Sequence, residues 1–206
     1  MAVKGKGDHM TDQEFLNLVL SMFNIERTVG DGTVETKLVE LFKPFAFREC
    51  CMFSDWSFLI KTRFYDACDC IQCDCEGMDG YDGHPHGFVL PQDFMKVRLL
   101  NGRYNEGFSI KGREIWCDHP SLRLDYYSYD CSKAPVEFEQ LAAYRCAIDI
   151  SQQLDPQGNA LKVAQSLHQI TLTTLSNRDA WSTRRKNPEF DLDDTVFKVP
   201  GNPYNP

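Results

Sequence analysis

The chain has 206 residues, of which 42% are hydrophobic and 25% charged, the composition of a globular domain with a sizeable core. Its formal net charge of −8 argues against a protein that grips nucleic acid, because such proteins cluster Lys and Arg against phosphates. No apolar run reaches the roughly 18 residues that span a bilayer. Because the first ten residues carry two lysines and no apolar stretch, we expect a soluble chain without a secretory signal, whose nine cysteines are mostly reduced.

The first quarter of the chain predicts two helices. Thr11 and Glu14 have the spacing of a capping box, and the apolar residues that follow recur at helical spacing over 11–25. The second helix is predicted over 33–54, where Pro44 should kink it or split it in two. Its apolar side consists of Leu38, Leu41, Phe42 and Phe45.

The middle of the chain changes to β patterning. Residues 66–83 are rich in Cys, Asp and Gly and predict a loop or a ragged hairpin, whereas 87–130 predict a small antiparallel β section. Lys111-Gly112-Arg113 reads as a tight hairpin turn, because its Gly can supply a positive φ. Residues 121–129 alternate apolar and polar side chains, as expected of a half-buried strand.

The last third is again helical, over 136–154 and 159–184. We therefore predict an α+β, mainly helical fold over 11–186: a four-helix bundle-like core with a small antiparallel β section inserted between the helix pairs. A flexible N-terminus, 1–10, precedes it. Residues 187–206 hold four prolines and no periodicity, and predict an extended C-terminal tail that becomes ordered against another surface.

One group of residues has metal-binding chemistry, because thiolates and imidazoles at short spacing can form a tetrahedral zinc site. The candidates are Cys68, Cys70, Cys73, Cys75, His84 and His86. Only Cys70 and Cys73 form a C-x-x-C pair, whereas zinc knuckles use two separated pairs. We therefore predict no bound cofactor, with a structural zinc ion as the alternative. A hairpin with small buried thiols, a redox pair of the thioredoxin kind and a calcium site of nearby carboxylates are the other readings.

Catalytic motifs are absent from the sequence. It contains no G-x-S-x-G, no H-E-x-x-H, no P-loop and no G-x-G-x-x-G at the start of a helix. His9, His119 and His168 are isolated along the chain. We predict that the protein is not an enzyme; a deep polar pocket joining His84 or His119 to a carboxylate would be the sign of one.

The predicted elements follow the order two helices, a β section, two helices and a tail. In this order the chain resembles the head-to-tail adaptors of short-tailed bacteriophages, the tail tubular protein A family. The stretches that carry the resemblance are FSDWSF at 53–58, GFVLPQDFMKV at 87–97, FSIKGREI at 108–115, and Pro135-x-x-Phe138 followed by Leu141-Ala142-Ala143-Tyr144. It covers roughly residues 11–186. The Cys- and Asp-rich segment 66–83 and the tail beyond Lys186 depart from the family pattern.

The resemblance implies a structural virion protein that is assembled in the host cytoplasm and located in the neck of the virion. It implies a homo-oligomeric ring, typically of twelve copies, between the portal protein and the tail nozzle or next tail ring. Double-stranded DNA would pass through the lumen without specific binding, and no membrane is involved. The tail would reach into the portal or a neighbouring subunit, and its candidate anchors are Phe190, Val196, Phe197, Val199 and Tyr204.

Two alternatives stay open at this point. The tail can instead be a strap on the chain's own surface. The whole chain can instead be a small zinc-binding protein-interaction module centred on the Cys68–Cys75 cluster, for which stoichiometric zinc would be the evidence.

Overall fold

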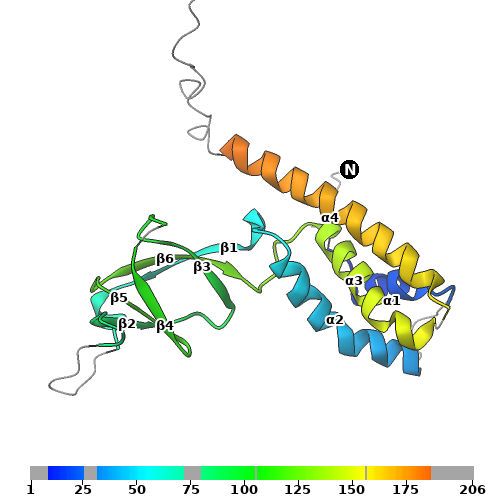
Figure 1. Cartoon of the computed structure of the whole chain (residues 1–206), viewed down its shortest axis with the longest axis horizontal. Helices are drawn as coiled ribbons and strands as arrows, with labels where there is room; N and C mark the ends of the chain where they lie inside the picture. The colour runs from blue at the N-terminus through cyan, green and yellow to red at the C-terminus, as the bar shows by residue number, and fades with distance from the viewer. Residues whose placement is uncertain (1–8, 26–31, 72–79, 105, 156, 187–206) are drawn as a thin grey trace, which may run out of the picture.

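The structure, a computed structural model, describes residues 9–25, 32–71, 80–104, 106–155 and 157–186 (Figure 1). These residues form an α+β fold with helices gathered at one end and strands at the other. The helices are α1 (Asp12–Ser21), α2 (Val34–Met52), α3 (Val136–Leu154) and α4 (Asn159–Lys186). The strands are β1 (Ile60–Tyr65), β2 (His86–Val89), β3 (Phe94–Leu100), β4 (Phe108–Lys111), β5 (Glu114–Cys117) and β6 (Leu122–Ser128).

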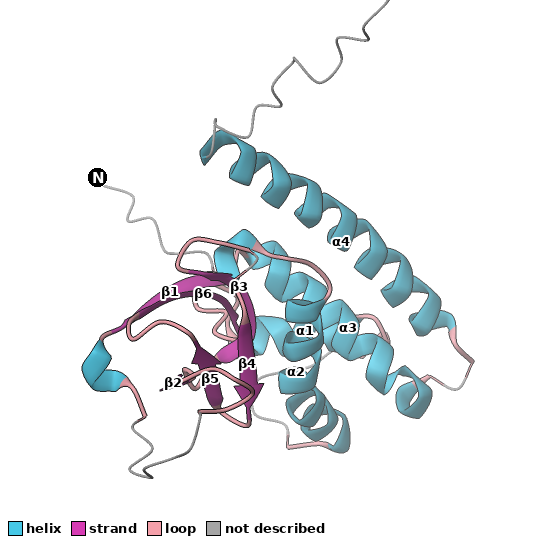
Figure 2. Cartoon of the chain, turned by 60° about the vertical axis from the view of Figure 1, so that its left-hand side comes forward, coloured by secondary structure: helices cyan, strands magenta, loops and turns pink. Residues whose placement is uncertain are grey.

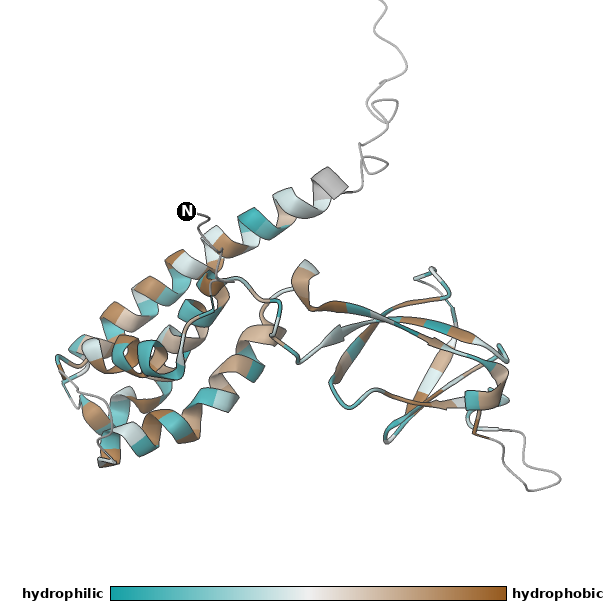
Figure 3. Cartoon of the chain, turned by 180° about the vertical axis from the view of Figure 1, so that it is seen from behind, coloured by the Kyte–Doolittle hydropathy of each residue, from teal (hydrophilic) through white to brown (hydrophobic). Residues whose placement is uncertain are grey.

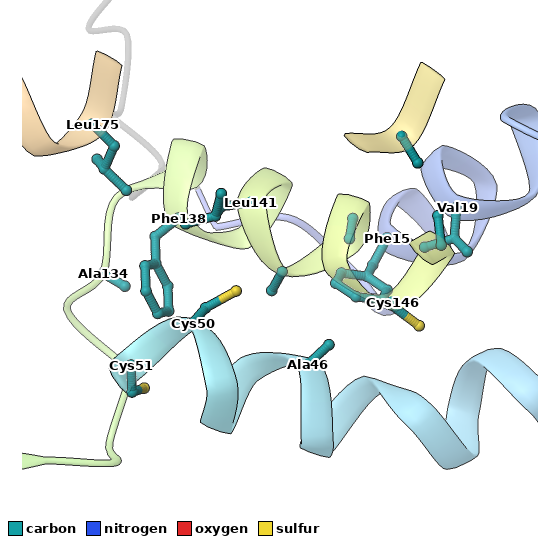
Figure 4. Packing of buried hydrophobic residues seen from close by; sticks show 14 of the residues in the cluster. Phe15, Val19, Ala46, Cys50, Cys51, Ala134, Phe138, Leu141, Cys146 and Leu175 are labelled. Atoms are coloured by element: carbon teal, nitrogen blue, oxygen red, sulfur yellow. The ribbon is translucent and has the colours of Figure 1, made fainter. Parts of the chain in front are cut away.

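Helix α3 is the centre of the helical part, because it packs against α1, α2 and α4. Its buried side includes Ala142, Ala143 and Ala147, whose small side chains let the neighbouring helices approach closely. Phe138 is fully buried at its start and points toward α2, near Cys50 (Figure 4). The predicted helix over 136–154 is confirmed with both its boundaries.

Helix α4 lies along α3, which is its main neighbour. Two side chains of α4, Ala164 and Leu175, are buried in the core of the helical part. The predicted four-helix bundle-like core is therefore not confirmed as such: three helices pack against α3, and α4 runs on its outer side (Figure 1). Among the described residues, no helix is both long and apolar enough to cross a membrane.

The predicted capping box of α1 is confirmed, since the Thr11 hydroxyl accepts from the Glu14 N–H and Glu14 reaches back to the Thr11 N–H. Helix α1 ends at Ser21, earlier than predicted, and Asn24 has a φ of 55° in the turn that follows. Helix α2 runs through Pro44 without a break, so the predicted split is wrong. Pro44 is exposed on the side of α2 that does not pack on α3.

The strands form two antiparallel sheets of three strands each, in the orders β1-β6-β3 and β2-β5-β4 (Figure 2). Both sheets contribute buried side chains to a second core, among them Tyr65, Phe88, Ile115 and Leu124. The predicted hairpin is confirmed, since β4 and β5 pair on either side of Gly112, whose φ is 60°.

The predicted β section was too short, because strands begin at Ile60 and not near residue 87. Strand β1 is an edge strand with one fully buried side chain, Tyr65, so its sequence lacks the alternation of a half-buried strand. Segment 66–83 begins with a short 3-10 turn at Ala67–Asp69 and an isolated bridge from Ile71 to Gly87. Its residues 72–79 lie outside the described part of the chain.

Candidate functional site

Four large apolar side chains form an exposed row on α2, here called the α2 face: Val34, Leu41, Phe45 and Met52. Each is at least 57% exposed. At 3.6 residues per turn they fall within about 40° of one another around the helix axis. Isolated exposed apolar residues are normal in a monomer, whereas an aligned row of four is typical of an interaction surface.

The α2 face is turned away from the core of its own subunit. The buried residues of the same helix, including Val39, Ala46 and Cys50, lie about 150° around the axis from it and pack toward α3. Helix α2 is therefore apolar on two sides. We predicted one apolar side of Leu38, Leu41, Phe42 and Phe45; Leu38 and Phe42 pack partly against the core, whereas Leu41 and Phe45 are exposed.

Helix α4 carries a second row, here called the α4 face: Val163, Ile170 and Trp181, each at least 52% exposed. These residues also share one side of their helix, since they are separated by nearly whole numbers of turns. Apolar segments, brown in Figure 3, recur along both α2 and α4.

The side chains around the α4 face carry no full charge between Val163 and Asn177, whereas Arg178 and Asp179 lie just before Trp181. Residues 163–177 include no Asp, Glu, Lys or Arg, although many of them are exposed. The hydroxyls of Ser166, Thr173 and Thr174 each donate to a carbonyl of their own helix at 2.9 Å, namely those of Lys162, Gln169 and Ile170. Their hydrogen-bonding capacity is thus partly used within the helix. Depletion of charge is the compositional mark of the centre of a protein interface.

The predicted metal ligands are only partly brought together. Cys70 Sγ lies 3.7 Å from His86 Nδ1, whereas Cys68 is exposed and His84 Nδ1 lies 2.7 Å from Asp118 Oδ1. Cys73 and Cys75 lie outside the described residues. In the part of the chain that the structure describes, no three His, Cys, Asp or Glu side chains are placed to hold one metal ion.

Cys117 is a neighbour of this pair that the sequence did not single out. It lies opposite His86 in the antiparallel register of β2 and β5, and its thiol donates to the His119 carbonyl at 3.6 Å. Burial raises the pKa of the Cys117 thiol, which therefore stays protonated near neutral pH. Spacing could not reveal this residue, because β pairing and not sequence proximity brings it to His86.

The histidines form surface pairs with carboxylates. His119 Nε2 lies 3.4 Å from Glu106 Oε1, and His84 pairs with Asp118. The side chains of His119 and Asp118 are 50% and 65% exposed, so water screens both pairs. His168 instead packs edge-on against the Phe53 ring, and burial lowers its pKa.

The predicted tail anchors Phe190, Val196, Phe197, Val199 and Tyr204 lie outside the described residues. No protein-family model and no curated protein matches the sequence. The described residues therefore define a class by their architecture alone: an α+β chain with a helical part, a β part and two exposed apolar helix faces.

Proposed function

We propose that this chain is a structural virion protein, the head-to-tail adaptor subunit of a tailed bacteriophage. Copies of it form a ring between the portal and the tail, and the ring is a conduit for DNA. The role is structural and not catalytic. The order of elements supports the proposal, since two helices precede the β part and two follow it, as the adaptor resemblance implies.

The observation that carries the proposal is the pair of exposed apolar faces on α2 and α4. A chain that stays monomeric gains nothing from leaving such rows in water, because each exposed apolar side chain forgoes its transfer free energy. A ring subunit contacts a neighbour on each side and needs two such surfaces. The helical part, in which α1, α2 and α4 each pack against α3, would then be the wall of the ring.

The charge of the chain fits a conduit for DNA. A formal net charge of −8 gives no general attraction to phosphates, so DNA can move past without being held. The tail 187–206 would dock on the portal or on a neighbouring subunit through its apolar and aromatic residues. Ordering such a segment only on binding lets assembly wait until the portal is in place.

Electron microscopy of the protein mixed with the portal ring from the same genome tests this proposal. We expect extra density stacked coaxially on the portal with full-length protein. Deletion of 187–206 should abolish or strongly reduce that density while the circular dichroism spectrum keeps its helical signal. Portal rings that stay bare with the full-length protein would overturn the proposal.

A second candidate function is a zinc-binding interaction module, favoured by the 3.7 Å approach of Cys70 Sγ to His86 Nδ1. The metal content of freshly purified protein tests it. This function requires about one zinc per chain, lost in Cys70→Ser and retained in the control Cys131→Ser, whose half-buried cysteine lies outside the Cys68–Cys75 cluster. Purified protein without zinc would exclude it.

A further inference from the structure

We infer that the α2 face of one copy packs on the α4 face of the next copy, and that this one contact repeats around the ring. The inference rests on the proposed function in that it names the subunit contact of the proposed ring. It commits to a second copy of this chain as the occupant of both faces. Four observations on the described residues lead to it.

Three exposed residues of each face have the same spacing, and the fourth residue of the α2 face, Phe45, corresponds in position to Thr174 of α4. Val34, Leu41 and Met52 are separated by seven and then eleven residues, and so are Val163, Ile170 and Trp181. At 1.5 Å per residue, both rows are about 27 Å long. Two rows of equal length and spacing can interdigitate along their whole extent, which is the requirement of helix-on-helix packing.

The two faces lie on different helices, one on each side of α3. Helix α3 lies between α2 and α4, and each outer helix buries its inner side against α3 (Figures 1 and 2). One subunit therefore offers two different surfaces on two different helices. Such a subunit builds head-to-tail chains, and these close into a ring when the rotation between neighbours permits.

Charge favours the unlike pairing over an antiparallel α2-on-α2 dimer. Lys37 and Arg48 are exposed along the same edge of the α2 face. An antiparallel contact that aligns Val34 of one copy with Met52 of the other brings Lys37 beside Arg48, two like charges. Residues 163–177 of α4 carry no charge, and the next cation, Arg178, already pairs with Glu137 of its own chain.

The need to cover both apolar faces also favours the contact between the α2 face and the α4 face. A symmetric contact through α2 leaves the α4 face in water, and a symmetric contact through α4 leaves the α2 face in water. The unlike contact covers both faces in every copy with one kind of contact, whereas symmetric pairing needs two different kinds. Because each subunit of a closed ring is held by two neighbours, a single contact can be modest in area.

The test uses two full-length variants that each block one face, Phe45→Glu and Ile170→Glu. Burying a carboxylate in an apolar contact should weaken association about 100-fold or more. By native mass spectrometry, each single variant is expected to be monomeric both without and with added portal rings. The matched control Phe64→Glu, at a residue of the β part that is 70% exposed, is expected to assemble like the wild type.

The decisive measurement is an equimolar mixture of the two blocked variants. Ile170→Glu retains the α2 face and Phe45→Glu retains the α4 face, so the mixture should form a heterodimer and stop there. A mixture of folded variants that stays monomeric, or a single variant that assembles like the wild type, would overturn the inference. A single variant that assembles like the wild type would be expected if the tail or the portal covered these faces.

Failure of this inference and failure of the proposed function look different. If the wild type decorates portal rings and both blocked variants do so equally well, the contact is wrong and the adaptor role stands. If the wild type assembles through both faces and never binds the portal, the contact stands and the adaptor role is wrong.

Discussion

The sulfur atoms of Cys51 and Cys131 lie 3.5 Å apart at the junction of the helical and β parts. Cys51 is near the end of α2, where the chain leaves the helices, and Cys131 lies between β6 and α3, where it returns. The two chain segments that connect the helical and β parts therefore meet at this pair of thiols.

We predict that a low-molecular-weight disulfide such as oxidised glutathione links Cys51 to Cys131 by thiol–disulfide exchange, with both protons lost and two reduced glutathione molecules released. The bond would raise the free energy of unfolding by up to about 4 kcal/mol, because it closes a long loop in the unfolded chain. Peptide mapping identifies the linked pair. Cys131→Ser is the control, and preferential linkage of the exposed Cys68 would contradict the prediction.

A second prediction concerns Lys61, whose ammonium donates to Asp93 and to Asp130, at 2.6 Å in each case. The hydrogen bond from Lys61 holds the pKa of Asp130 at about 2. Partial burial raises the pKa of Asp93, but hydrogen bonds from Lys61 and Ser128 outweigh it and the net shift is downward. Because both carboxyl pKa values are lowered in the folded state, this stabilisation is present above about pH 4. It is lost as the pH falls toward about 2.

Lys61→Met should lower the free energy of unfolding at pH 7 by about 1–2 kcal/mol, since Asp93 and Asp130 both lose the ammonium that pairs with them. It should also flatten the loss of stability between about pH 4 and 2. Urea titrations across this pH range measure both effects. The control Lys96→Met removes an exposed ion pair with Asp55 and should change stability by less than about 1 kcal/mol. Equal effects of the two variants would contradict the prediction.

A third prediction concerns the end of α4. The Asp179 carboxylate accepts from the Ser57 N–H at 2.9 Å and from the Ser57 hydroxyl, so it ties α4 to the segment that enters β1. Asp179→Ala should cost about 1–3 kcal/mol and speed amide hydrogen exchange in the last turns of α4. Hydrogen exchange with mass spectrometry measures the change. Exchange that rises equally throughout α1 and α3 would show a global effect instead.

Local signals predicted local structure well. The capping box at Thr11, the hairpin at Gly112 and both ends of the helix over 136–154 follow from chemistry within a few residues of each position. Strand β1 could not be predicted in this way, because an edge strand with one buried side chain carries little periodicity. The approach of Cys117 to His86 depends on strand register, which spacing along the chain does not contain.

The α2 and α4 faces show a different limit. Helical periodicity places Leu41 and Phe45 on one side of α2, but it cannot say whether that side meets the chain's own core or another molecule. The absence of charge from 163–177 is the sequence signal that could have identified the α4 face, because a solvated helix normally carries Lys or Glu on its outer side.

The mass of the wild-type assembly tests the central claim most directly. Native mass spectrometry of the full-length protein, alone and with portal rings added, distinguishes a closed ring from other states. We predict one dominant species at a fixed multiple of the 23.7 kDa chain, without a ladder of intermediate sizes. A chain that remains monomeric under both conditions, at every concentration, would contradict the account.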